Sequence, residues 1–339
     1  MKKLLIVYSV LIAAFGLFFY IYFFRGDQQA SWESAYAGSM QGSAEEHYVM
    51  VTFLSGIDYW KSCLKGFEDA AEALGVSVEY RGATSYDVHE QITVMEQVIA
   101  RKPAGIALTA MDPAALVDTI NKAVDSGIPV VLFDSGAEGS KAYSFLGTDN
   151  YNAGAAAARQ MAKLTGGGGQ VAVVTLPNQL NHEERVAGFR AALRAEFPDI
   201  DVVAVENGKG DQLASEQVAR ELLEEYPKLR GIFVTEANGG VGVGAAVKKA
   251  NRLPDVSIVS FDTDKGTLDM VRDGTIAATM AQGTWNMGYW SLMHLFHLHH
   301  GLARPVPNWE QADVPLLPTY VDTGVSVVTR DNVEHYYAK

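Results

Sequence analysis

The stretch GIALTA at residues 105–110 recurs as GIFVTE at residues 231–236, and this repeat decides the expected fold. Two other dipeptides, GF and FD, recur in the same order on either side of it. The offsets are 122 residues for GF (66 to 188), 126 for GI (105 to 231) and 128 for FD (133 to 261). Ordered matches with slowly growing offsets indicate two similar domains, and a chain of 339 residues is long enough for both.

Around these repeats the sequence alternates segments typical of strands and of helices. Residues 47–54 are apolar and β-branched, and residues 59–74 have the spacing of an amphipathic helix. The alternation continues through a helical segment at 114–125 and an apolar strand at 128–133. Such alternation predicts parallel strands connected by helices that cover both faces of a sheet. We therefore expect an α/β fold with two similar doubly wound parallel-sheet lobes.

Composition and charge exclude several classes of protein. Apolar residues make up 48% and charged residues 20%, which is typical of a globular protein and not of a disordered one. The formal net charge is −13, although Lys2, Lys3 and Arg25 place three positive charges in the first 25 residues. The rest of the chain is therefore more acidic still. An acidic body repels phosphate backbones, so we expect no nucleic-acid partner.

The first 25 residues are typical of a membrane-targeting segment. Residues 4–24 carry no charge, follow two lysines and end at Arg25. As a helix they are long enough to cross a bilayer core of about 30 Å, with the lysines on the cytoplasmic side and the body outside. A cleaved signal peptide is the alternative. A lipid anchor is excluded because the only cysteine, Cys63, lies far from this segment.

Asp134 and Asp262 follow apolar strands at equivalent positions of the two halves. In parallel α/β sheets the ligand crevice lies beyond the carboxyl ends of the strands, so we expect both carboxylates to face one ligand. The alternative is that each Asp caps the turn after its strand. Tyr59 and Trp60 follow the first strand, at the same edge of the first sheet. An aromatic face there can stack on a sugar ring, while core packing competes for one of the two.

The stretch NGGVGVGA at residues 238–245 matches a dinucleotide-binding pattern. Gly240, Gly242 and Ala245 satisfy GxGxxA after an apolar strand. The motif lies in the second half of the chain, and we therefore favour close packing of a helix on the sheet. No nucleophile, base and orienting group occur together, which argues against an enzyme. We expect no cofactor, and a dinucleotide-dependent enzyme is the least favoured alternative.

Four histidines, His294, His297, His299 and His300, cluster near the end of a predicted helix. Two pairs, His294 with His297 and His297 with His300, are three residues apart, a spacing that can place two nitrogens on a metal ion. No carboxylate or thiolate is close in sequence, and histidines near a helix C-terminus also complement its dipole. We therefore expect no metal site.

Taken together, these features of residues 47–339 resemble the periplasmic sugar-binding proteins of the ribose and galactose type, the solute receptors of ABC importers. The resemblance implies two α/β lobes joined by a three-segment hinge, closing around one monosaccharide, a pentose or a hexose. It implies a receptor rather than an enzyme, located in the periplasm or on the outer face of the cytoplasmic membrane. The implied partner is the membrane permease of an ABC importer.

The resemblance also places the ligand-binding residues. Asp accepts hydrogen bonds from sugar hydroxyls, Arg donates a fork of them, and Asn and Gln do both. The expected ligand-binding residues are Tyr59, Trp60, Asp134, Ser135, Arg185, Asn238, Asp262 and Gln282. Ser135 stands where the ribose type has an arginine, which argues against ribose itself.

The hydrophobic start departs from the importer receptors, which are usually released or carry a lipid. Anchored relatives can resemble the sensing partners of membrane histidine kinases that control sugar-uptake genes, so such a kinase is the alternative partner. The expected organisation is a signal anchor or signal peptide at 1–25, a flexible stalk at 26–46, an N-terminal lobe at 47–148 plus 283–317, and a C-terminal lobe at 149–282 plus 318–339.

Overall fold

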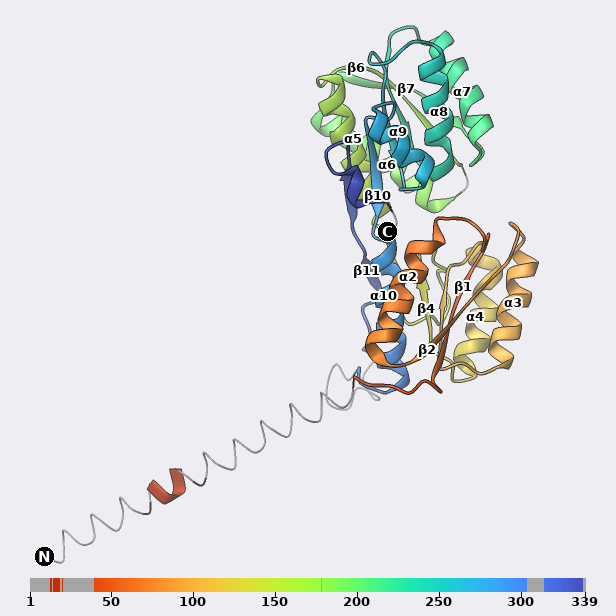
Figure 1. Ribbon diagram of the computed structural model, residues 1–339, viewed down its shortest axis with the longest axis vertical. Helices are drawn as coiled ribbons and strands as arrows, with labels where there is room; N and C mark the ends of the chain where they lie inside the picture. The colour runs from red at the N-terminus through yellow and green to blue at the C-terminus, as the bar shows by residue number, and fades with distance from the viewer. Residues whose placement is uncertain are drawn as a thin grey trace, which may run out of the picture.

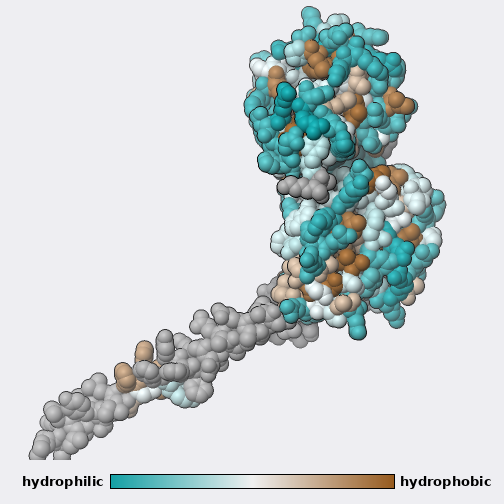
Figure 2. Space-filling view, viewed as in Figure 1, coloured by the Kyte–Doolittle hydropathy of each residue, from teal (hydrophilic) through white to brown (hydrophobic). Residues whose placement is uncertain are grey.

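The computed structural model describes residues 13, 15–18, 20, 40–177, 179–303 and 314–337. From residue 40 onward the described chain forms two lobes, one above the other in Figure 1. Each lobe is built on one six-stranded sheet. Figure 2 shows that the surface of both lobes is mostly hydrophilic on this side, with hydrophobic residues in scattered patches.

All strand pairs of the first sheet are parallel, and its strand order is β11-β5-β4-β3-β1-β2. Its strands are β1 (His47–Thr52), β2 (Ser77–Gly82), β3 (Gly105–Leu108), β4 (Val130–Phe133), β5 (Phe145–Gly147) and β11 (Tyr320–Asp322). The helices of this lobe are α2 (Trp60–Leu74), α3 (Val88–Ala100), α4 (Pro113–Asp125) and α10 (Thr284–His299). Helices α2 and α10 share one core cluster with the sheet, and α3 and α4 share another, so both faces are covered.

The second sheet has the order β12-β10-β9-β8-β6-β7, with β12 antiparallel to β10 and the other pairs parallel. Its strands are β6 (Gly169–Thr175), β7 (Ile200–Asn207), β8 (Leu229–Val234), β9 (Ser257–Phe261), β10 (Ala278–Gln282) and β12 (Val325–Val328). The helices are α5 (Asn150–Thr165), α6 (Leu180–Glu196), α7 (Gln212–Glu225), α8 (Ala237–Lys249), α9 (Lys265–Asp273) and the short η2 (Val333–His335). The α/β class with two parallel-sheet lobes is confirmed.

The repeated GF dipeptide lies on a helix of each lobe at a point where two helices touch. A Cβ atom on Gly66 of α2 would lie 2.1 Å from the carbonyl oxygen of Trp285 on α10. A Cβ atom on Gly188 of α6 would lie 1.9 Å from the carbonyl oxygen of Tyr151 on α5. Only glycine permits such close backbone contact. The glycine of each GF pair therefore lets one helix pack closely against its neighbour, and the phenylalanine that follows it is buried.

The chain crosses between the lobes three times. It runs from β5 of the first lobe to α5 of the second, returns from β10 of the second lobe to α10 of the first, and leaves again from β11 of the first sheet to β12 of the second. One predicted boundary is wrong. The sequence places residues 318–339 in the second lobe, but Tyr320–Asp322 pairs in parallel with β5 and extends the first sheet. The Tyr320 ring also lies 5.8 Å from the Phe145 ring. A three-residue strand has too little periodicity to show its partner in the sequence.

The predicted flexible stalk is also too long. The N–H of Gly42 donates to the carbonyl oxygen of Leu74 at 2.7 Å, and Met40 packs against the first core. Residues 40–46 therefore belong to the folded body. Most of the predicted membrane segment and most of the stalk lie outside the described residues. No helix within the described ranges is both long and apolar enough to cross a bilayer.

Candidate functional site

Asp134 and Asp262 occupy equivalent positions, directly after β4 and β9. Both have a left-handed backbone, with φ of 60° and 66°, which is uncommon for residues other than glycine. Each backbone N–H continues the pairing to the next strand, from Asp134 to Leu146 O at 3.0 Å and from Asp262 to Met280 O at 2.8 Å. The side chains bond to groups distant in sequence, and α9 is capped by Asp264 instead. This geometry disfavours the turn-cap alternative.

On the side of the first lobe, Asp134 accepts two hydrogen bonds from hydroxyl groups. Tyr59, immediately before α2, donates its hydroxyl to Asp134 Oδ1 at 2.5 Å. Thr109, immediately after β3, donates to Oδ2 at 3.5 Å. Burial and the negative charges of Asp134 and Asp262 raise the pKa of Tyr59, so its phenol stays protonated and donates.

On the side of the second lobe, Arg185 of α6 is only 2% exposed. It donates to Asn150 Oδ1 at 2.9 Å, to the carbonyl oxygen of Thr235 at 2.8 Å and to Gln282 Oε1 at 3.0 Å. Its guanidinium carbon also lies 3.8 Å from the centre of the Phe261 ring. An arginine has five N–H groups, so these bonds leave two for a ligand.

Gln282, the last residue of β10, joins the two halves of this cluster. Its Nε2 donates to Asp262 Oδ1 at 2.7 Å and to the Tyr59 hydroxyl at 3.1 Å, across the lobes. Its Oε1 accepts from Thr148 at 2.8 Å and from Arg185. Tyr59, Asp134, Arg185, Asp262 and Gln282 therefore form one hydrogen-bonded group from five separate elements. We call these five residues the interlobe cluster.

The interlobe cluster holds two carboxylates near one guanidinium. Burial raises the pKa of Asp262 to about 6, although Arg185 and the hydrogen bond from Gln282 favour the charged form. Burial also raises the pKa of Asp134, opposed first by the hydrogen bond from Tyr59. The cluster thus offers buried acceptors and donors together, which suits a polar ligand that carries several hydroxyl groups.

The fold and the two-lobe cluster lead to a known family. The family model described as a periplasmic binding protein domain matches residues 48–301. The chain belongs to this periplasmic binding protein family. It is similar to the crystal structure of a sugar-binding protein of a sugar ABC transporter from Bacillus halodurans, with 65% identity and a TM-score of 0.83 over 86% of this chain and 100% of that one.

Two further solved structures of the same fold are informative. AraP, an arabinose-binding protein from Geobacillus stearothermophilus, is 65% identical with a TM-score of 0.82, over 86% of this chain and 99% of that one. A chain of the XylFII–LytSN complex is 28% identical with a TM-score of 0.71, over 84% of this chain and 98% of that one.

Three of the predicted ligand-binding residues lie outside the interlobe cluster of this periplasmic binding protein. Trp60 is 2% exposed, donates its indole N–H to the carbonyl oxygen of Phe53 at 2.8 Å and packs edge-on against Phe133. Core packing therefore uses its ring and its only donor, which disfavours a role at the ligand, and its assignment to the ligand site stays a prediction. Asn238 is exposed and donates to the carbonyl oxygen of Gly210 at 3.1 Å.

Ser135, the third of these residues, follows Asp134 directly. Its backbone carbonyl accepts from the N–H of Ala110 at 3.0 Å, which fixes the loop after β4. This bond keeps the chain after β4 beside the chain after β3. Ser135 therefore holds Asp134 at the site, and its role toward a ligand stays a prediction.

Several residues of the site were not predicted. Thr109, Thr148 and Thr235 directly follow β3, β5 and β8, and each bonds to a member of the interlobe cluster. Their position after apolar strands is a signal that sequence analysis can use. Glu236 is 7% exposed, its Oε1 has no hydrogen-bond partner among the described residues, and burial raises its pKa to about 7. Glu236 directly follows Thr235 in the chain, and its Oε2 accepts a hydrogen bond from the backbone N–H of Asn238 rather than from the interlobe cluster.

The glycine-rich stretch does not form a phosphate-binding turn. Gly240 and Gly242 lie inside α8, whereas a dinucleotide motif places its glycines in the turn before the helix. A Cβ atom on Gly242 would lie 2.1 Å from the carbonyl oxygen of Gln212 on α7, and one on Gly240 would lie 2.0 Å from Ser260 Oγ on β9. These glycines therefore serve close packing of α8, on a second helix as well as on the sheet.

Proposed function

We propose that this chain is an extracytoplasmic receptor that binds one monosaccharide, a pentose or a hexose, between its lobes and presents it to an ABC importer. The interlobe cluster carries this proposal, because it collects side chains of both lobes around two buried carboxylates and one arginine. A sugar has neutral hydroxyls that both donate and accept, so it can replace the direct contacts within the cluster without adding charge. The sugar-binding relatives at 65% identity support the same ligand class.

Closure of the lobes around the sugar is part of this proposal. The chain crosses between the lobes at residues 147–149, 282–284 and 322–325. Thr148 of the first crossing and Gln282 of the second bond to one another. Short connections of this kind allow two rigid lobes to rotate about a shared axis. The sugar would favour the closed form because only that form engages both carboxylates.

Arabinose is the first sugar to test. Arabinose, xylose, ribose and galactose are titrated separately into the purified protein by isothermal titration calorimetry, with melting temperatures recorded in parallel. We expect one sugar to bind with a stoichiometry of one and to raise the melting temperature, because it binds only the folded state. No response to any pentose or hexose, together with stabilisation by a nicotinamide dinucleotide, would restore the enzyme hypothesis.

A sensing role beside a membrane histidine kinase is the second candidate. The XylFII–LytSN complex shows that a protein of this fold assembles with another protein. Uptake of labelled sugar in a strain that lacks this chain separates the two roles. Loss of uptake supports the importer, and unchanged uptake with loss of sugar-induced transcription supports the kinase.

A membrane tether at residues 1–25 completes the proposal. Its support is the uncharged run at 4–24 after two lysines. We expect the protein to stay with washed membranes after cell fractionation and to be released once residues 1–25 are replaced by a cleavable export signal. Full recovery of the unaltered protein in the soluble fraction would favour the cleaved signal peptide.

A further inference from the structure

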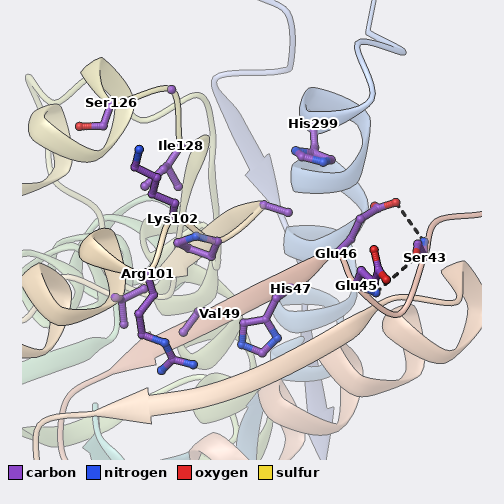
Figure 3. A pocket seen from close by; sticks show the side chains of 14 residues that line it. Ser43, Glu45, Glu46, His47, Val49, Arg101, Lys102, Ser126, Ile128 and His299 are labelled. Carbon is purple, nitrogen blue, oxygen red and sulfur yellow. Dashed lines mark hydrogen bonds between the residues drawn. The ribbon is translucent and has the colours of Figure 1, made fainter.

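A second polar group lies at the far edge of the first lobe, away from the interlobe cluster. The interlobe cluster lies beyond the carboxyl ends of the strands, whereas this group lies at the amino end of β1. A cavity of about 660 Å³ opens there, lined by residues 43–47, 101–104 and 126–128 and bordered by His299 of α10. Figure 3 shows Glu46, on the chain leading into β1, and His299, on α10, on the same side of this cavity.

Glu46, His299 and His300 bring three potential metal ligands together. Each offers one atom, a carboxylate oxygen or an imidazole nitrogen, and these atoms lie within 4.8 Å of one another. His300 Nε2 is already 2.8 Å from Glu46 Oε2. Glu46 and His300 are 254 positions apart in the chain, so only the fold brings the carboxylate to the histidines.

Neighbouring groups hold the carboxylate in place. The backbone N–H of Ser43 donates to Glu46 Oε1 at 3.0 Å, and the Tyr48 hydroxyl donates to Oε2 at 3.5 Å. The His299 ring packs edge-on against Tyr48 at 6.0 Å and against His300 at 5.3 Å. Such surrounding contacts orient ligating side chains and increase metal affinity.

We propose that Glu46, His299 and His300 bind a divalent transition-metal ion, with zinc as the best match. Two imidazoles and one carboxylate are a donor set that zinc accepts, with water in the fourth position. Calcium and magnesium prefer all-oxygen sites, which this group does not provide. Bonds of about 2 Å in a tetrahedron place ligand atoms about 3.3 Å apart. The three ligand atoms lie within 4.8 Å of one another here, so they have to come closer together. The His299 side chain is exposed and is free to turn toward Glu46 and His300.

The metal would tie the start of the body to the end of α10. Glu46 directly precedes β1, and α10 packs on α2 within the first core. Binding to the folded state alone stabilises that state, so the metal strengthens the contact between residues 43–46 and the end of α10. Because this group lies at the opposite edge of the sheet from the interlobe cluster, sugar affinity should not change.

This set differs from the pairs suggested by spacing alone. The three-residue spacing pointed to His294 with His297 and to His297 with His300. In the structure, His294 Nδ1 is buried without a hydrogen-bond partner among the described residues, and burial lowers the His294 pKa to about 4. The carboxylate joins the adjacent histidines His299 and His300 instead.

The test is calorimetric titration of zinc chloride into the full-length protein, kept in detergent and free of any histidine tag. We expect one high-affinity site in the unaltered protein and an affinity at least tenfold lower in His299→Ala and in Glu46→Gln, since even an outer contact of a metal site is commonly worth that much. The matched control is His89→Ala, which removes another exposed histidine from the same lobe and should leave zinc affinity unchanged.

Melting temperatures give an independent readout. Zinc should raise the melting temperature of the unaltered protein and of His89→Ala, and the chelator EDTA should reverse this increase. His299→Ala should melt at the same temperature with zinc and with EDTA. The proposal is overturned if the unaltered protein binds no zinc, if His299→Ala and Glu46→Gln retain full affinity, or if His89→Ala loses as much affinity as they do.

Discussion

Replacement of Arg185 by alanine should abolish measurable sugar binding, with affinity falling at least 100-fold. Arg185 makes three hydrogen bonds in a buried position and carries the positive charge near Asp134 and Asp262. Removing it takes one donor from each of three acceptors, among them the buried Asn150, and leaves two carboxylates without a neutralising charge. Losses of this kind commonly cost about 3–5 kcal/mol, which corresponds to more than 100-fold.

Two companion variants make this result specific. Arg190→Ala removes an exposed arginine from the same helix and should leave sugar affinity unchanged. Arg185→Lys keeps the charge but loses the planar fork, so its affinity should be intermediate. Should Arg185→Ala fail to fold, Arg185→Lys still decides the matter. Affinity equal to that of the unaltered protein, measured by calorimetry in Arg185→Lys and, if it folds, in Arg185→Ala, would remove Arg185 from the site.

The second large effect concerns the two aspartates. Asp134→Ala and Asp262→Ala should each weaken sugar binding by about 1–3 kcal/mol, or roughly 5- to 150-fold, because a sugar hydroxyl loses its acceptor. Asp118→Ala, which removes an exposed aspartate from α4, is the control and should have no effect. Calorimetric affinities of both site variants that match the control would show that these residues have only a backbone role after β4 and β9.

The same pair of carboxylates predicts a pH dependence. Burial raises the pKa of Asp262 to about 6 in the sugar-free protein, and hydroxyl donors from a bound sugar would lower that pKa by favouring the charged form. Sugar binding then releases a proton below pH 6, so affinity should fall as the pH falls from 7 to 5, by about tenfold per pH unit once Asp262 is protonated. In Asp262→Ala this part of the pH dependence should disappear, and its persistence there would assign it to another group.

Much of the interlobe cluster was predictable, since strand ends in an α/β sheet mark the ligand edge. Asp134 and Asp262 stand at that edge in both halves, and the structure places Tyr59, Arg185 and Gln282 with them. Which of two adjacent aromatics faces the site was not predictable. Tyr59 and Trp60 both carry an aromatic ring that can stack on a sugar. Only the positions of the Phe53 carbonyl and the Phe133 ring draw Trp60 into the core.

By itself, the sequence determined that this protein has two similar parallel-sheet lobes and where most helices and strands lie. Those features are predicted by local periodicity and by a repeat whose segments recur in the same order in both halves of the chain. Only the tertiary structure decided that Tyr320–Asp322 extends the first sheet and that Glu46 meets His300. Contacts between residues far apart in the chain depend on how whole helices and strands pack together. Such packing produces no local sequence pattern, so the sequence does not indicate which distant residues will meet.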